Sequence, residues 1–268
     1  MSLENLDKAA LIRLSEDNMR EKLAYVPGKL STMDTKTFEH TLVVDSGMPS
    51  DTFNAAFGGE ITKELALRVI DYYQAKRFPM AWWIGPSSHN QLADSILSDC
   101  GLIHDELDIG MFCALDSLEI NTDTPAGFEI KICQDTGEFN DFGKILSSIF
   151  DPIDHSVQQF YQMIASIPRE EMNQLRLFVG YMDGQAVTTG AAFLTDVAGI
   201  YDISTHPEAR KKGYGSAMFN NILKYVQDQG LRYAVLQASE DGLGIYKRSG
   251  FEEICQFNVW SNQELLSR

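Results

Sequence analysis

The densest positive charge of this chain is the run Arg210-Lys211-Lys212, which is followed by Gly213 and Gly215. The run comes after an apolar stretch ending near Thr205 and before residues with helical apolar spacing. Such a loop points several backbone N–H groups at one anion, and the first turn of the helix adds unpaired donors and a favourable dipole. The pattern predicts an anion site at Arg210 to Ser216. Two glycines before a helix can also make only a turn, so this motif alone is weak.

A second motif lies about 30 residues further on, where Tyr246 is followed four residues later by Gly250-Phe251. Together the two motifs resemble the GNAT superfamily of N-acetyltransferases. The acetyl-CoA loop of that family has the form Arg/Gln-x-x-Gly-x-Gly/Ala, which Arg210 to Gly215 matches, and the tyrosine with Gly-Phe is its second signature. The resemblance covers about Phe128 to Trp260.

The resemblance implies that the backbones of Ile203, Ser204 and Thr205 bind the acetyl carbonyl and pantetheine, where their strand splays from the next one. It implies that the loop holds the pyrophosphate of acetyl-CoA, so that the expected cofactor residues are Ile203, Ser204, Thr205, Arg210, Lys211, Lys212, Gly213, Tyr214, Gly215, Ser216 and Ser239. Ser239 stands where relatives often have asparagine. No metal is expected.

Acyl transfer to an amine needs an oxyanion site, a proton donor for the leaving thiolate and a proton acceptor for the amine. Tyr246 is the expected donor, because a phenol with a pKa near 10 protonates a thiolate without being ionised at rest. A core aromatic is the alternative for Tyr246. The glutamate of the histone-acetylating branch would fall at Gly199, so the acceptor is open between Asp202 and a water relay. His155 and His206 are better explained as loop or capping residues.

The elements that must position these residues follow from hydrophobic periodicity and turn signals. Asp183-Gly184 predicts a tight hairpin, and Gly250 predicts a helix stop. The predicted order is β-α-α-β-β-β-α-β-α-β, an α/β fold with a mixed sheet, over residues 128–133, 137–149, 156–167, 177–182, 186–194, 200–205, 216–227, 233–237, 241–248 and 251–260.

A polar cluster at Asn121 to Gly127 predicts a boundary between domains at 1–122 and 123–268. The first part has helical signals at 3–22 and 62–76 and strand signals at 41–44, 80–84 and 108–114. Through Phe53–Phe57 and Trp83–Pro86 it resembles the degenerate first domain of tandem GNAT proteins. Its Gly58-Gly59-Glu60 is too short and too acidic to wrap a diphosphate.

The composition indicates which kinds of partner the protein can bind. A net charge of −16 repels nucleic acid and anionic lipid and suits a cationic or neutral substrate, although acidity also serves solubility alone. Four scattered cysteines indicate reduced thiols rather than a zinc site or a disulfide framework. The sequence has no apolar run of membrane-spanning length, and Met1 to Arg20 has no signal-peptide core, so a cytoplasmic monomer or homodimer is expected.

The leading hypothesis is an N-acetyltransferase acting on a primary amine of a small molecule or peptide, by direct attack in a ternary complex. Its acidic cleft would use the first domain, the Asp151–His155 loop and Glu170-Glu171. The alternative is a non-catalytic acyl-CoA-binding regulatory module, against which Tyr246 argues. A nucleotide-binding protein is excluded because neither phosphate-loop glycine spacing occurs.

Overall fold

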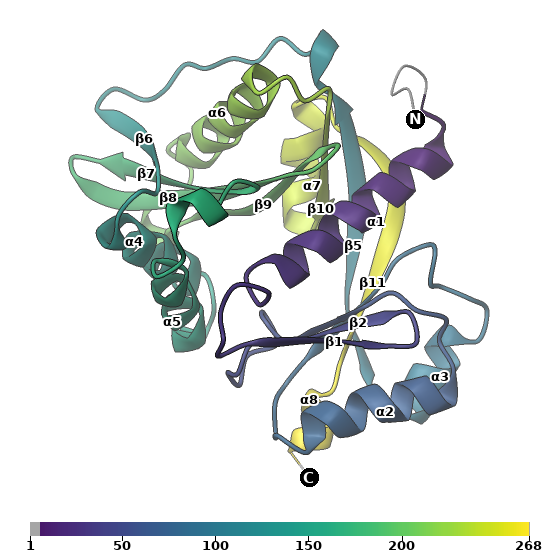
Figure 1. Cartoon of the computed structure of the whole chain (residues 1–268). Helices are drawn as coiled ribbons and strands as arrows, with labels where there is room; N and C mark the ends of the chain where they lie inside the picture. The colour runs from purple at the N-terminus through teal and green to yellow at the C-terminus, as the bar shows by residue number, and fades with distance from the viewer. Residues whose placement is uncertain (1–5, 268) are drawn as a thin grey trace. The chain divides into compact units, whose positions relative to one another are not determined.

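A computed structural model describes residues 6–267, which form two compact units (Figure 1). The first unit contains the chain up to Met111 together with Gln237–Arg248 and the residues from Glu252 onward. The second unit contains Phe112–Leu236 and Ser249–Phe251. The units group residues by packing and are not continuous in sequence, so the domains predicted at 1–122 and 123–268 stay a prediction.

The first unit is a sheet with strand order β1-β2-β3-β4-β11-β5, with helices against it. The β3 and β4 strands are parallel, whereas β1 with β2, β2 with β3, and β4 with β11 are antiparallel. Its elements are α1 (Lys8–Tyr25), β1 (Asp34–Phe38), β2 (Thr41–Asp45), β3 (Ala55–Phe57), α2 (Lys63–Gln74), β4 (Ala81–Ile84), α3 (Ala93–Asp99), β5 (Ile103–Ala114, to Met111 in this unit), α7 (Glu240–Arg248), β11 (Glu252–Ser261) and α8 (Gln263–Leu266).

The β2 strand is buried on both faces, which explains its unbroken apolar run. Leu42 and Val44 pack with Met19 of α1, while Val43 faces the other way and packs in the cluster that holds Leu65 of α2. Successive strand residues point to opposite faces, so the sheet needs a helix on each side. Burial of these aliphatic side chains contributes roughly 1.5–3 kcal/mol each.

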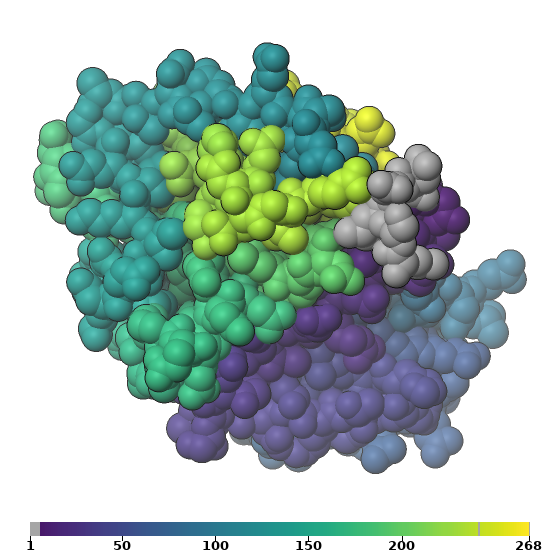
Figure 2. All heavy atoms as spheres, turned by 45° about the horizontal axis from the view of Figure 1, so that its top comes forward, coloured from purple at the N-terminus to yellow at the C-terminus, as the bar shows by residue number. Residues whose placement is uncertain are grey.

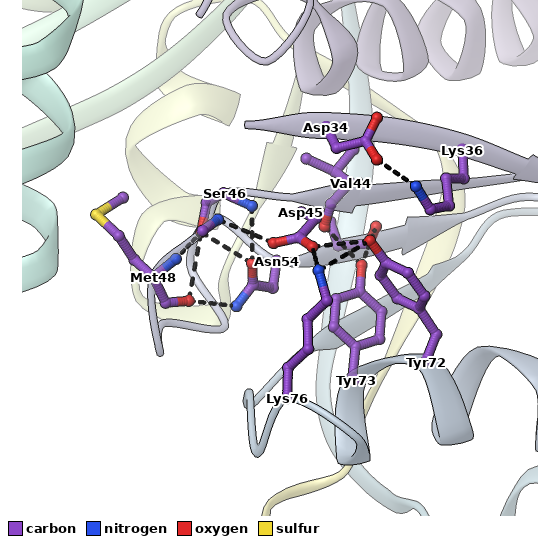
Figure 3. A network of polar contacts seen from close by, with 12 residues as sticks. Asp34, Lys36, Val44, Asp45, Ser46, Met48, Asn54, Tyr72, Tyr73 and Lys76 are labelled. Carbon is purple, nitrogen blue, oxygen red and sulfur yellow. Dashed lines mark hydrogen bonds and ion pairs between the residues drawn. The ribbon is translucent and has the colours of Figure 1, made fainter. Parts of the chain in front are cut away.

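Buried polar groups of the first unit form hydrogen bonds and an ion pair with one another (Figure 3). The buried Asp45 carboxylate accepts from the Tyr72 hydroxyl at 2.7 Å and forms an ion pair with Lys76. The Tyr73 hydroxyl, fully buried, donates to the carbonyls of Val44 at 2.6 Å and Ala55 at 3.1 Å. This network joins α2 to β2 and β3 and serves the fold.

The second unit has strand order β10-β9-β8-β7-β6. A hairpin joins β7 to β8, and its turn residues Asp183 and Gly184 have φ of 50° and 77°, as the sequence predicts. Its elements are a 3-10 turn η1 (Leu115–Ser117), β6 (Phe128–Ile132), α4 (Thr136–Ser147), α5 (His155–Ile164), a 3-10 turn η2 (Arg169–Glu171), β7 (Leu175–Met182), β8 (Gln185–Leu194), β9 (Ala198–Thr205), a 3-10 turn η3 (Pro207–Ala209), α6 (Tyr214–Asp228) and β10 (Tyr233–Ala238, to Leu236 in this unit).

The two faces of this sheet carry different helices: α6 packs on one side and α4 with α5 on the other (Figure 1). Gly190 on β8 permits the contact with α6, because an added Cβ would lie 2.5 Å from both Ile203 Cδ1 and Ile222 Cδ1. The Asp135 side chain caps α4 by accepting from the Glu138 N–H at 3.0 Å. The start of α4 is thus fixed by a neighbouring side chain, whereas the face that α6 turns to the sheet is fixed by packing.

The predicted order of elements from β6 to β11 is confirmed, with bounds that differ by a few residues. Residues 3–5 of the first predicted helix lie outside the described residues, and the rest of that helix is α1. Besides the three 3-10 turns, four helices or strands in residues 6–267 were not predicted: β1, β3, α3 and α8. Each is short or polar, so it carries little periodic signal. In residues 6–267, no helix is long and apolar enough to cross a membrane.

Candidate functional site

The β9 strand bears an irregularity at the predicted acetyl site. Pairing with β8 matches Ala191 with Tyr201 and Thr189 with Ser204, so two β9 residues, Asp202 and Ile203, face one residue of β8. This is a β-bulge, and Asp202 takes a left-handed conformation with φ of 55°. Aspartate is one of the few residue types that adopt this conformation readily.

Two buried threonines of β8 fix the direction of the peptides beyond the bulge. The Thr189 hydroxyl donates to the Asp202 carbonyl at 3.0 Å, and the Thr188 hydroxyl donates to the Ser204 carbonyl at 2.7 Å. A trans peptide directs its C=O and N–H to opposite sides. The N–H groups of Ile203 and Thr205 therefore point away from β8.

The side of β9 to which these N–H groups point is the side of β10. In residues 6–267, the pairs found between β9 and β10 are Ala198 with Ala234 and Gly199 with Val235, and none follows toward Thr205. The strands splay there, as expected from the resemblance. The peptide between Ile203 and Ser204 points in the opposite direction to its two neighbours, so the Ser204 N–H faces β8 and the Ile203 carbonyl faces the splay.

The loop after β9 combines two left-handed residues. Lys211 has φ of 62° and Gly213 has φ of 86°, with the Gly213 conformation forming the N-terminal cap of α6. The first hydrogen bond of the helix runs from the Ala217 N–H to the Gly213 carbonyl at 3.0 Å. The N–H groups of the three residues before Ala217, the last of them Ser216, precede that bond and are available to an anion.

Gly215 places the start of α6 against the end of β9. An added Cβ at this position would lie 2.9 Å from Thr205 Oγ1, closer than Cβ atoms approach their neighbours. Tyr214 anchors the same turn: it is buried and stacks on Phe128, with ring centroids 5.0 Å apart. The start of α6 is therefore fixed against the end of β9, where the N–H groups of Ile203 and Thr205 point away from β8.

The three cationic side chains of the loop are exposed. Arg210 Nε donates to the Thr205 carbonyl at 3.3 Å, and Lys212 Nζ donates to the Glu208 carbonyl at 3.1 Å. None of the ion pairs found within residues 6–267 involves Arg210, Lys211 or Lys212. Atoms of this region, yellow-green in Figure 2, form part of the molecular surface. The loop therefore carries exposed positive charge directly before the start of α6.

Ser239 and Tyr246 both belong to the first unit. Ser239 is exposed and directly precedes α7, and Tyr246 lies within α7. The Tyr246 ring lies back over Gly242, where an added Cβ would approach its Cε2 to 2.8 Å. Burial, together with the charge of Asp108, raises the pKa of Tyr246 to about 12. The phenol is therefore protonated throughout the physiological range, as a proton donor must be.

The sequence that carries this geometry matches a known protein family. A family model described as "Acetyltransferase (GNAT) domain" matches residues 170–254, which contain β9, the loop and α7. Residues 170–254 form a GNAT domain. No curated protein matches the sequence.

Solved structures extend the likeness to the fold of the whole chain. A GCN5-related N-acetyltransferase from Kribbella flavida is 15% identical with a TM-score of 0.68, and the match covers 92% of this chain and 95% of that one. A tandem GNAT protein from the clavulanic acid biosynthesis pathway is 11% identical with a TM-score of 0.59, covering 93% and 94%. At these identities the likeness shows the fold, and it confirms the predicted fold class.

One polar contact at the bulge does not follow from any motif in the sequence. The Tyr161 hydroxyl of α5 donates to Asp202 Oδ2 at 2.9 Å, across 41 residues of sequence. No spacing rule connects these two positions. Gly199, where the histone-acetylating branch has glutamate, is buried at the start of β9.

Other polar residues of the chain have local roles or lie away from the predicted site. His206 Nδ1 accepts from the Glu208 N–H at 3.3 Å, the predicted capping role, and His155 is exposed at the start of α5. A cavity of about 170 Å³ beside β6 and β7 includes Arg169 and Arg176 but none of the predicted site residues. Within residues 6–267, no three His, Cys, Asp or Glu side chains gather to hold a metal ion.

Proposed function

We propose that the protein is an N-acetyltransferase that moves an acetyl group from acetyl-CoA to a primary amine of a small molecule or peptide, by direct attack in a ternary complex. The observation that carries this proposal is the direction of the Ile203 and Thr205 N–H groups beside a splay. Two donors held in this way suit an acyl oxygen that gains negative charge during attack.

The loop supports acetyl-CoA as the acyl donor. Its left-handed residues and the first turn of α6 would direct several N–H groups at one anion, and a diphosphate carries the charge that such donors and the helix dipole favour. Gly215 would let the diphosphate approach the backbone. The remaining predicted cofactor residues, including Ser239, stay proposals.

Tyr246 would protonate the sulfur of CoA. A phenol with a pKa of about 12 exceeds an ordinary thiol by roughly 3.5 units, so transfer to a solvated thiolate costs roughly 5 kcal/mol. The cost falls when the thiolate departs in a water-poor site, because burial also raises the pKa of a thiol. The acidic chain, with a net charge of −16, favours a cationic or neutral acceptor.

The first unit would be a GNAT-like copy without cofactor. Its parallel pair β3 and β4 stays joined through Phe57 with Trp83, and the Gly58 N–H still donates to the Trp83 carbonyl at 3.4 Å. The loop carbonyls are also occupied: the Thr41 hydroxyl donates to Gly58 O at 3.0 Å and Arg20 donates to Phe57 O at 3.3 Å. The strands therefore do not splay for an acyl group.

The test is incubation of the full chain with acetyl-CoA and a panel of primary amines, with CoA and acetylated amine measured by mass spectrometry. Mass detection is preferable to a thiol dye because all four cysteines are free thiols, and Cys100 and Cys255 are partly exposed. Acetyl transfer to any amine supports the proposal. Tight acetyl-CoA binding without transfer or hydrolysis would favour the regulatory module, and absence of binding would refute both.

A further inference from the structure

Asp202 is fixed from three directions at the bulge. Its backbone is left-handed, its carbonyl accepts from Thr189, and its carboxylate Oδ2 accepts from the Tyr161 hydroxyl. Within residues 6–267, no hydrogen bond or ion pair is found for its second oxygen, Oδ1. The carboxylate is only partly exposed, so it is held in place with one oxygen open.

Tyr161 is well suited to hold that carboxylate. The residue is buried, its ring lies 4.4 Å from that of Phe142, and burial together with the charge of Asp202 raises its pKa well above the ordinary value. The phenol therefore stays protonated and can only donate to the carboxylate. Among the described residues, Cys133 acts electrostatically on Tyr161, and Tyr201 interacts with Asp202. Burial raises the pKa of both groups, so neither is charged near neutral pH.

The pair adjoins the reacting atoms of the proposed function. Asp202 immediately precedes Ile203, whose N–H is directed to the splay where the acyl oxygen would lie. The side chains of the two residues diverge, since Ile203 reaches α6 past Gly190 while Asp202 meets α5. The carboxylate is thus one residue from the oxyanion donor and on the face covered by α5.

We propose that Asp202 accepts the proton of the attacking amine and that Tyr161 is the positioning residue that holds it. This inference rests on the proposed function. In the step, the amine nitrogen bonds to the acyl carbon and passes one proton to Asp202. The C–S bond then breaks, the sulfur receives one proton from Tyr246, and both side chains recover their starting states by exchange with water.

The test compares Asp202→Asn, Tyr161→Phe and the double variant in the full chain. Asparagine tolerates the left-handed backbone and still accepts from Tyr161, so Asp202→Asn removes the base and leaves the bulge. We expect kcat to fall about 10²- to 10⁴-fold. Tyr161→Phe should lower kcat about tenfold, and the double variant should be no worse than Asp202→Asn, because both act on one step.

The double-mutant cycle separates a positioning role of Tyr161 from a structural one. Tyr161→Phe should lower kcat in the parent background and have no further effect in the Asp202→Asn background, a coupling that a merely structural role would not produce. The matched control is Tyr181→Phe, since the Tyr181 hydroxyl donates to Asp141 at 3.2 Å in the same unit, away from the bulge. Tyr181→Phe should leave kcat unchanged.

Hydrolysis of acetyl-CoA needs the same proton acceptor with water as the nucleophile, so it provides a second assay that requires no amine. If Asp202→Asn retains parental rates in transfer and in hydrolysis, the inference is overturned while the proposed function stands. A loss of kcat on Tyr161→Phe that persists in full in the Asp202→Asn background refutes the positioning role. If the parent protein neither transfers nor hydrolyses, the proposed function fails and the inference fails with it.

Discussion

Replacement of Gly215 by glutamate tests the anion site most directly. The added Cβ would lie 2.9 Å from Thr205 Oγ1, so the start of α6 or the end of β9 must shift. The new carboxylate would also approach the diphosphate. Two unit charges 4 Å apart repel by about 4 kcal/mol at an effective dielectric constant of 20, and breaking each charge-assisted N–H hydrogen bond to the diphosphate costs about 1.5–3 kcal/mol.

We therefore expect Gly215→Glu to weaken acetyl-CoA binding by more than about 10³-fold, measured by titration calorimetry on the full chain. Gly137→Glu is the control, because Gly137 is likewise the second residue of a helix in the same unit, and its added Cβ would meet only Asp135 Oδ1 at 3.1 Å. Thermal unfolding should show both variants folded. Parental affinity in folded Gly215→Glu would mean that the segment is only a turn.

Four further expectations concern the rest of the molecule. Tyr246→Phe keeps the ring volume, so kcat in the transfer assay should fall about 10²- to 10⁴-fold with little change in the KM for acetyl-CoA; an unchanged kcat would require another donor. Because the pKa of Tyr246 is about 12, the parental pH–kcat profile should have no basic limb below about pH 10, and a limb near pH 9 would exclude this donor. Burial and the charge of Glu106 raise the pKa of Asp108 to about 6, above its unfolded value near 4. The contribution of Asp108 to stability, complete below pH 4, is therefore lost as the pH rises through 6. Asp108→Asn should then stabilise the protein by up to about 3 kcal/mol at pH 7.5 and not at pH 4 in urea titrations, and equal effects at both values would contradict the assignment. Tyr73→Phe removes the hydroxyl that serves two buried carbonyls and should cost about 1–3 kcal/mol in the same titrations, whereas a neutral effect would show that water replaces it.

The sequence could predict features that depend on neighbours along the chain. The Asp183-Gly184 turn requires positive φ angles that these two residue types adopt, and the family signatures at Arg210 and Tyr246 led to the GNAT domain that the comparisons find. The order of the later elements follows from periodicity for the same reason.

Features that depend on distant residues could not be predicted. Asp202 is compatible with a bulge but does not require one, and the bulge depends on how β8 pairs with β9. The Tyr161 contact joins residues 41 positions apart. The grouping of Gln237–Arg248 with the first unit is likewise a result of packing, so sequence alone assigned Ser239 and Tyr246 to the second domain.

The threonine hydroxyls of β8 have a further consequence for isotope exchange. They satisfy the carbonyls of Asp202 and Ser204, and in doing so leave the amides of Ile203 and Thr205 directed to a splay inside a well-packed sheet. Amides at the centre of a sheet normally exchange with deuterium only when the structure opens. These two should instead exchange early in the free protein and slow together once an acyl group occupies the splay, which gives a residue-level signal of occupancy that is independent of turnover.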